Sequence, residues 1–377
     1  MNLTVSQYAI VEGVKKAGWV ITAKGGTAHL RDIWLKADDA GLTIMASSGE
    51  VEFSGTYPAT VQKPGFLGTH GVSFVQFVSN LPPAELHLHA TGRGLHVKGQ
   101  DIDYDLQTTD TDAFQPLMPF PSPPPALISW ETLHQVLDKV EFCIDPFGSG
   151  AACCLMIRAT GEDMVEFAGS DHGSRLALLV ATNSDLHDTL PAEGLLIQRQ
   201  YLPFLRKLAD GGSVEVGISD RRLFLRNTST DETMSVPRTF AEPIRYQKLA
   251  EGITQCRTHL EVDRKDLVKA LTRLQIFTSE TNEKMLLSVQ NGEVVLQLAS
   301  AGHASCVERL KIDDPPLILE EGFSQAFKPS MLLEIAQHYS SERIDLYLQD
   351  QYLNAMKGRQ DPGYTVFFSS YYDDNRK

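Results

Sequence analysis

The chain has 377 residues, of which 48 are acidic and 34 basic, and a formal net charge of −14. This balance excludes an exterior that is basic throughout, so any nucleic-acid site must be local. No apolar run approaches the roughly 20 residues of a membrane helix, and the first residues lack the charged and apolar regions of a secretory signal. The five cysteines form no C-x-x-C pair, which is typical of reduced thiols. We expect a soluble, cytoplasmic protein with no membrane partner.

In chain order, a pattern of helix, strands, helix and strands occurs three times. The first helix of each cycle is predicted to begin near Ser6, Ser129 and Asp263, and the second near Val72, Arg199 and Lys328. The second helices recur roughly every 128 residues, a spacing too long for a solenoid unit and suited to a whole domain. The sequence therefore predicts three tandem copies of one domain, called here the three repeats.

Alternating runs separated by turns predict antiparallel strands within each repeat. Such runs occupy residues 85–89, 94–98, 213–218, 223–225 and 343–348. Prolines make residues 119–125 a stiff linker, and periodicity lapses again over 248–257. We predict an α+β fold with two helices per domain packed on antiparallel sheets. The predicted domains are 1–120, 127–247 and 258–377.

Basic side chains gather on several predicted helices. In the helix after Asp263, leucines at 267, 271 and 274 form one apolar stripe, while Lys265, Lys269 and Arg273 recur on the opposite side. The helix from Arg199 adds Arg206 and Lys207, and Lys24 lies in a glycine-containing loop. Each helix taken alone fits an ordinary solvated face. Their recurrence in an acidic chain favours a shared cationic surface.

Two segments carry a family resemblance. Residues 169–177 (GSDHGSRLA) and 263–273 (DRKDLVKALTR), in a chain of three α+β domains, resemble the beta subunit of bacterial DNA polymerase III, the sliding clamp. The resemblance implies a non-enzymatic ring of two chains, joined head to tail around duplex DNA, without cofactor or metal. Such a ring attracts phosphates without reading bases. The expected DNA-binding residues are Lys24, Arg199, Arg206, Lys207, Lys265, Lys269 and Arg273.

The resemblance also implies a pocket for peptides of DNA polymerase and of the clamp loader. The matching positions are Arg175, Leu176, Pro243, Met331, Val366 and Phe367. For Leu176 and Met331, ordinary core packing is the alternative. The chain departs from the family at its C-terminus, where the aromatic run from Tyr364 onward alters the expected pocket wall.

The expected joint between two chains also departs from the family. Its first-domain edge, which is often basic, here carries Asp101, Asp103 and Asp105, and the opposing segment carries Arg309 and Lys311, with His303 nearby. The signs of the two edges are exchanged relative to the family, but opposite charges would still face each other across the joint. These departures motivate a second hypothesis, a clamp-derived interaction scaffold that no longer encircles DNA.

An enzyme is disfavoured by the same sequence. Ser170, Asp171 and His172 are adjacent, whereas a catalytic triad converges from separate elements, so this run predicts a turn. His87 and His89 share one side of a strand, but no third metal ligand is suitably spaced. Neither phosphate-binding glycine motif is present. A hydrolase remains a third hypothesis without a site.

Overall fold

The computed structural model describes residues 1–22, 27–92, 94–122, 125–171, 173–208, 211–279, 283–298, 306–312, 318–320, 322–349 and 353–371. They form two compact units. The first unit comprises residues 1–134, 188–190 and 200–239, and the second comprises 135–187, 191–199 and 240–377. The division passes through the predicted middle domain, and the limits of the three predicted domains remain predictions. Among the described helices, none is long and apolar enough to cross a membrane.

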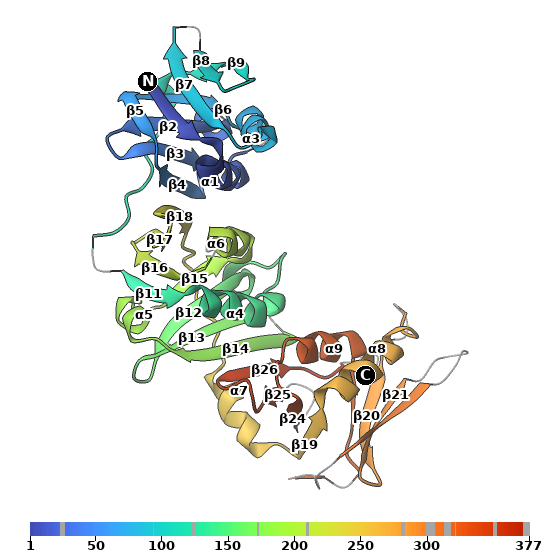
Figure 1. Ribbon diagram of the computed structural model, residues 1–377. Helices are drawn as coiled ribbons and strands as arrows, with labels where there is room; N and C mark the ends of the chain where they lie inside the picture. Colours follow the sequence, from blue (N-terminus) through green and yellow to red (C-terminus); the bar gives the residue numbers. More distant parts are fainter. Residues whose placement is uncertain are drawn as a thin grey trace. The chain divides into compact units, whose positions relative to one another are not determined.

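The first unit contains two antiparallel sheets (Figure 1). The smaller sheet has the order β5 (Thr60–Lys63), β1 (Asn2–Ser6), β7 (Glu85–Thr91), β8 (Gly94–Lys98) and β9 (Asp103–Leu106). The larger sheet has the order β10 (Thr108–Thr109), β6 (Gly65–His70), β2 (Asp32–Asp38), β3 (Gly41–Ser47), β4 (Glu52–Tyr57), β18 (Glu232–Pro237), β17 (Arg222–Asn227), β16 (Ser213–Ile218) and β11 (Ala126–Ser129). The larger sheet thus joins strands of the first repeat to strands of the second.

The helices of the first unit include α1 (Gln7–Val20), α2 (Ala28–Arg31), α3 (Gly71–Asn80) and α6 (Leu202–Leu208), with the short η1 (Thr111–Ala113). The N-terminal part of α4 (Trp130–Val140) belongs to this unit as well. α1 buries Ile10, Val14 and Ala17 at helical spacing, and it packs against α3 (Figure 1). A Cβ at Gly13 would lie 1.8 Å from the Tyr57 hydroxyl, so the close approach of α1 to β4 requires glycine.

The second unit contains the other two sheets, also antiparallel. One has the order β15 (Leu195–Gln198), β12 (Cys154–Thr160), β13 (Met164–Ser170), β14 (Arg175–Thr182), β26 (Tyr364–Phe368), β25 (Asn354–Gly358), β24 (Arg343–Leu348) and β19 (Thr258–Asp263). The other has the order β22 (Cys306–Lys311), β21 (Glu293–Leu298), β20 (Met285–Gln290) and β23 (Ser324–Phe327). The eight-stranded sheet joins the second repeat to the third through β14 and β26.

The second unit also holds most of α4, together with α5 (Ser184–Thr189), α7 (Gln247–Gly252), α8 (Arg264–Gln275) and α9 (Pro329–Gln337). Its short 3-10 turns are η2 (Glu141–Cys143), η3 (Gly150–Cys153) and η5 (Ile253–Gln255), and η4 (Arg199–Tyr201) lies at the border between the units. α8 and α9 pack against each other, as α1 and α3 do in the first repeat. The predicted fold class, three tandem α+β copies, is therefore confirmed.

Five of the six predicted helix starts agree with the structure to within a residue or two. α1, α4 and α8 follow Ser6, Ser129 and Asp263 directly, and α3 and α9 begin at Gly71 and Pro329. The helical segment predicted near Arg199 begins there as the 3-10 turn Arg199–Tyr201 and continues as an α-helix from Leu202. Pro203 follows immediately, and a proline is tolerated only in the first turn of a helix.

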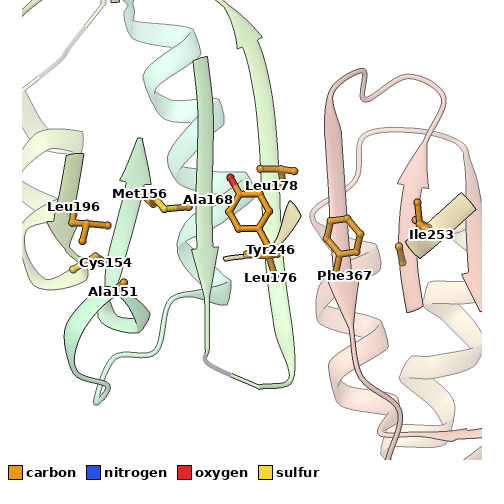
Figure 2. Packing of buried hydrophobic residues seen from close by; sticks show 11 residues of the cluster. Ala151, Cys154, Met156, Ala168, Leu176, Leu178, Leu196, Tyr246, Ile253 and Phe367 are labelled. Carbon is orange, nitrogen blue, oxygen red and sulfur yellow. The ribbon is translucent and has the colours of Figure 1, made fainter. Parts of the chain in front are cut away.

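A buried apolar cluster covers one face of the eight-stranded sheet (Figure 2). Leu176 of β14, Phe367 of β26 and Ala355 of β25 lie opposite one another across three strands. Met156, Ala168 and Leu178 form a neighbouring row. The segment around α7 closes this cluster with Tyr246 and Ile253, which are 2% and 7% exposed. The connection from the second repeat to the third is thus part of the core.

Candidate functional site

α8 presents the basic side predicted from the sequence. The Asp263 carboxylate accepts a hydrogen bond of 2.9 Å from the backbone N–H of Asp266 and caps the helix. Leu267, Leu271 and Leu274 are buried, while Lys265 and Lys269 are exposed. The Lys269 ammonium lies 3.6 Å from Asp266, a surface pair of small energy. α8 therefore offers two exposed lysines on the side opposite its core contacts.

Arg273, the third predicted cation of α8, is exposed but bound within the chain. Its guanidinium donates two hydrogen bonds of 2.7 Å to the two carboxylate oxygens of Glu308 on β22. This hydrogen bonding lowers the pKa of Glu308 below its ordinary value. A bidentate pair of this kind holds the guanidinium in a fixed direction. Arg273 brings less net positive charge to the surface than Lys265 or Lys269.

The cations predicted for the helix at Arg199 have different environments. The half-buried Arg199 guanidinium donates to the backbone carbonyl of Ile144. Arg206 is also half-buried, and Lys207 is exposed, with its ammonium 4.5 Å from the ring centre of Trp19. Lys24 lies outside the described residues. A cationic wall shared by several repeats remains a prediction; in the described part of the chain, its exposed members are Lys207, Lys265, Lys269 and the Glu308-bound Arg273.

A pocket of about 270 Å³ opens over the apolar cluster of the eight-stranded sheet. Leu176, Phe367, Ile244 and Leu249 provide its apolar lining, and polar groups come from Ser170, Ser174, Arg175 and Ser369. The backbone N–H of Ser369 donates to the Ser174 carbonyl at 2.9 Å, which ties the end of β26 to the loop before β14. An apolar floor with a few polar groups at its rim suits an apolar side chain of a peptide.

The structure brings together three of the six predicted pocket residues, Arg175, Leu176 and Phe367. Pro243 is half-buried beside the lining residue Ile244, and Met331 is half-buried on α9. Val366 is fully buried and pairs with Ala177. Because neighbouring strand residues face opposite sides, Val366 points away from the face that carries Leu176 and Phe367. The alternation of side chains along a strand follows from the sequence alone, so the opposite directions of Val366 and Phe367 could have been predicted.

Arg175 is held firmly at the rim of the pocket. Its guanidinium donates to Asp171 at 3.0 Å and also binds Glu334 of α9. Asp171 also accepts hydrogen bonds of 2.9 and 2.7 Å from the backbone N–H groups of Ser174 and Arg175. Burial opposes the charge of Arg175, but the hydrogen bond to Asp171 and the nearby Cys143 and Glu334 raise its pKa above the ordinary value. The loop before β14 is therefore pre-organised.

Arg158 on β12 ties the segment before α7 to the eight-stranded sheet. Its guanidinium donates to Glu166 at 2.7 Å and to the Tyr246 hydroxyl at 3.1 Å. Burial raises the pKa of Glu166, although the Arg158 charge opposes the rise. The lining residues Ile244 and Leu249 could not be predicted from the sequence, since neither belongs to a recognisable local motif.

Each of the two joints between repeats contains a buried pair of a lysine and a carboxylate. Lys16 stands ten residues after Ser6, and its ammonium contacts Glu232 of β18 at 2.5 Å. Lys139 stands ten residues after Ser129 and contacts Asp361, in the loop before β26. The side chains of both pairs are at most 7% exposed. The corresponding position in the third repeat, ten residues after Asp263, is Arg273, which is exposed and bound to Glu308.

The strands predicted to join two chains both end their sheets among the described residues. β9, with Asp103 and Asp105, pairs with β8 at the edge of the five-stranded sheet, and the loop before it carries Asp101. The His96 ring contacts Asp105 at 3.0 Å and Asp103 at 3.6 Å. β22, with the exposed Arg309 and Lys311, is the edge of the four-stranded sheet. His303 lies outside the described residues.

Ser170 and Asp171, of the run from Ser170 to His172, bind groups of the loop before β14. The Ser170 hydroxyl donates to the Arg175 carbonyl at 2.9 Å, Asp171 caps the turn, and His172 lies outside the described residues. Within the described residues, no three His, Cys, Asp or Glu side chains are grouped to hold a metal.

Comparison with known proteins agrees with this architecture. A model of the N-terminal domain of the DNA polymerase III beta subunit matches residues 1–119. The beta sliding clamp of Chlamydia pneumoniae is 19% identical over 93% of this chain and 94% of its own length. The clamp structures from Caulobacter crescentus and Bacillus subtilis superimpose with TM-scores of 0.85 and 0.87, at 19% and 15% identity, covering 99% of this chain and 100% and 99% of theirs. The chain thus resembles the DNA polymerase III beta sliding clamps throughout its length, and its first 119 residues match the N-terminal domain of that subunit.

Proposed function

We propose that the protein is a DNA sliding clamp, a non-enzymatic processivity factor that encircles duplex DNA and tethers a DNA polymerase. The observation that supports the proposal is the equivalence of the two joints inside the chain, at β4–β18 and β14–β26. Within the described residues, β9 and β22 each end a sheet, and we propose that they form a third joint of the same kind. Two copies that pair these edges head to tail form a closed cycle.

The proposed DNA contacts are the exposed Lys207, Lys265 and Lys269, supported by Arg199, Arg206, Arg273 and Lys24. A clamp needs only diffuse attraction to phosphates, because topology holds it on DNA. Acidic side chains outnumber basic ones over the whole chain, which disfavours binding of DNA to the remaining surface.

The proposed partner site is the pocket around Leu176, Phe367 and Leu249. Its apolar floor fits a peptide of a polymerase or clamp loader that inserts an aliphatic or aromatic side chain. Arg175 shapes the rim, and its guanidinium is already bound to the carboxylates of Asp171 and Glu334. We therefore assign specificity to the apolar lining.

Retention on circular DNA tests the proposal. The clamp is loaded onto nicked circular plasmid, by a clamp loader or by mild opening of the dimer, and is passed over a sizing column in high salt. Retention that disappears when the plasmid is linearised is the expected result, because a ring slides off an open end. Equal retention on circular and linear DNA, or none on either, contradicts encirclement.

The alternative, a clamp-derived scaffold that does not encircle DNA, is supported by the weak cationic character of two predicted contacts. Arg273 is neutralised by Glu308, and Arg199 is turned toward the Ile144 carbonyl. Sedimentation separates the two functions. A monomer at micromolar concentration favours the scaffold, and a dimer favours the clamp.

A further inference from the structure

Two adjacent cysteines, called here the dithiol pair, have no part in the proposed function. Cys153 is the last residue of η3, and Cys154 is the first residue of β12. Within a continuous strand, neighbouring side chains point to opposite faces. At this junction of turn and strand, the two sulfur atoms instead lie 3.9 Å apart. Both thiols donate to the backbone carbonyl of Gly150, at 3.2 and 3.3 Å, so the two sulfurs converge on one side of the chain.

Geometry disfavours the oxidation of the dithiol pair to a disulfide. The Cα atoms of adjacent residues are about 3.8 Å apart, whereas a relaxed disulfide spans roughly 4.4–6.8 Å between Cα atoms. Neither sulfur belongs to a disulfide in the structure. We therefore expect the pair to keep both thiols under conditions that oxidise better-placed cysteines. Two thiols that face each other can hold one atom of a thiophilic element between them.

The distance between the two sulfurs suits such a bridging atom. With sulfur bonds of about 2.3 Å and a tetrahedral angle, as at zinc, two sulfurs lie about 3.8 Å apart. A zinc ion, however, requires further ligands. In the part of the chain that the structure describes, no third His, Cys, Asp or Glu side chain is grouped with the pair. An element that is satisfied by two sulfurs and one further substituent fits the pair better.

Burial points to the same kind of ligand. Cys154 is 1% exposed and belongs to the apolar cluster of Figure 2, and the half-buried Cys153 packs against that cluster. A zinc ion completed by water would bring polar ligands into apolar surroundings, which is costly. A neutral adduct that carries an apolar substituent brings none. Trivalent arsenic bound to two sulfurs and one organic group meets this requirement.

We propose that Cys153 and Cys154 form a binding site for trivalent arsenic compounds of the type R–As=O, where R is an apolar organic group. Two sulfur–arsenic bonds form, and the two thiol protons leave with the arsenic-bound oxygen as one water molecule. Arsenic stays trivalent throughout, so the step needs neither an oxidant nor a reductant. Cys153 gives the ligand its first contact because its thiol is the more exposed one, and Cys154 completes the ring from the buried side.

The bound arsenic would lie beside a segment that lines the proposed partner pocket. A Cβ at Gly150 would lie 3.9 Å from the Ala241 methyl group. Ala241, Ile244 and Cys153 all pack against the same apolar cluster, and Ile244 also lines the pocket. An aryl group on arsenic should therefore displace this segment and weaken peptide binding. This second effect rests on the proposed function of the pocket, whereas the binding of arsenic does not.

Titration of the folded protein with phenylarsine oxide tests the site. Native mass spectrometry should show one phenylarsenic group per chain, with the loss of two reactive thiols and release by a small dithiol such as 2,3-dimercaptopropanol. Cys153→Ser and Cys154→Ala should each weaken binding at least tenfold, because a single sulfur remains. The matched controls Cys256→Ser and Cys306→Ser, which remove half-buried thiols elsewhere, should bind as the wild type does.

Circular dichroism shows whether each variant is folded, and Cys153→Ser leaves the buried thiol in place in case Cys154→Ala does not fold. The site is refuted if the wild type takes up arsenic only at millimolar concentration or not at all, or if Cys153→Ser binds it as tightly. Arsenic binding that leaves the affinity for a polymerase-derived peptide unchanged refutes the link to the pocket. A wild type that binds arsenic but no such peptide supports the site and contradicts the proposed function of the pocket.

Discussion

The buried pair between Lys139 and Asp361 gives the sharpest test of how the repeats are joined. The Asp361 carboxylate accepts hydrogen bonds from the Lys139 ammonium, from the Ser341 hydroxyl at 2.6 Å and from the Ser341 N–H at 2.8 Å. The side chains of Lys139 and Asp361 are 7% and 2% exposed. Asp361→Ala leaves a buried ammonium without a counter-charge, which costs about 3–5 kcal/mol.

Lys139→Met should cost less, because Asp361 keeps its bonds to Ser341 and loses a single charge-assisted hydrogen bond of about 2 kcal/mol. The double variant Lys139→Met/Asp361→Ala should be more stable than Asp361→Ala alone, since no uncompensated charge remains. This order of stabilities distinguishes a charge effect from a loss of packing.

The distribution of tryptophans lets the assay separate the two units. Trp19, Trp34 and Trp130 all belong to the first unit, so their fluorescence follows that unit, whereas far-UV circular dichroism follows both. In urea titrations, a transition that is seen by circular dichroism and not by fluorescence reports unfolding of the second unit. Asp361→Ala should lower the midpoint of that transition. Glu232→Ala, which breaks the equivalent pair with Lys16, should lower the fluorescence midpoint.

Two results would refute this reasoning. One is a cost below about 1 kcal/mol for Asp361→Ala, which is far under the value for an uncompensated buried ion. The other is a double variant that is less stable than either single variant, which would mean that packing of the two side chains, and not their charges, stabilises the joint.

Three further predictions concern pH, DNA and peptide binding. Burial raises the pKa of Asp361, but the hydrogen bonds from Lys139 and Ser341 outweigh it and lower that pKa below its ordinary value of 3.8. The stabilisation by ionised Asp361 is therefore fully present above the pKa of this group in the unfolded chain, and it is lost as the pH falls through its pKa in the folded chain. The second unit, followed by circular dichroism, should lose stability below about pH 4 in the wild type and much less in Asp361→Asn. Lys265→Ala/Lys269→Ala should weaken DNA binding, measured by fluorescence anisotropy, and should lower the slope of log affinity against log salt concentration by about 0.9 per lost phosphate contact. Substitution of the exposed Lys63 by alanine is the control, and an unchanged slope in the double variant would mean that α8 does not contact DNA. Leu249→Arg should reduce binding of a polymerase-derived peptide at least tenfold in calorimetry while retention on circular DNA stays intact, and undiminished peptide binding would place the partner site elsewhere.

Local patterns in the sequence determined the repeat, the fold class and most helix starts. The capping residue Asp263 and the leucines at 267, 271 and 274 predicted both the beginning of α8 and its buried side, because helix caps and helical spacing act over a few residues. The sequence also showed the acidic segment at Asp103 and the basic segment at Arg309, since the charges of a short segment follow directly from its residues.

Only the tertiary structure decided which of these residues meet. Lys16 and Glu232 lie far apart in the sequence, and no local pattern distinguishes this buried lysine from the exposed Lys15 beside it. The guanidinium of Arg199, a predicted DNA contact, binds the backbone carbonyl of Ile144, a contact between distant segments that no local pattern shows. Strand pairing and burial depend on contacts between distant segments, so the joints between repeats and the pocket at Leu249 are properties of the fold, whereas the repeats themselves are properties of the sequence.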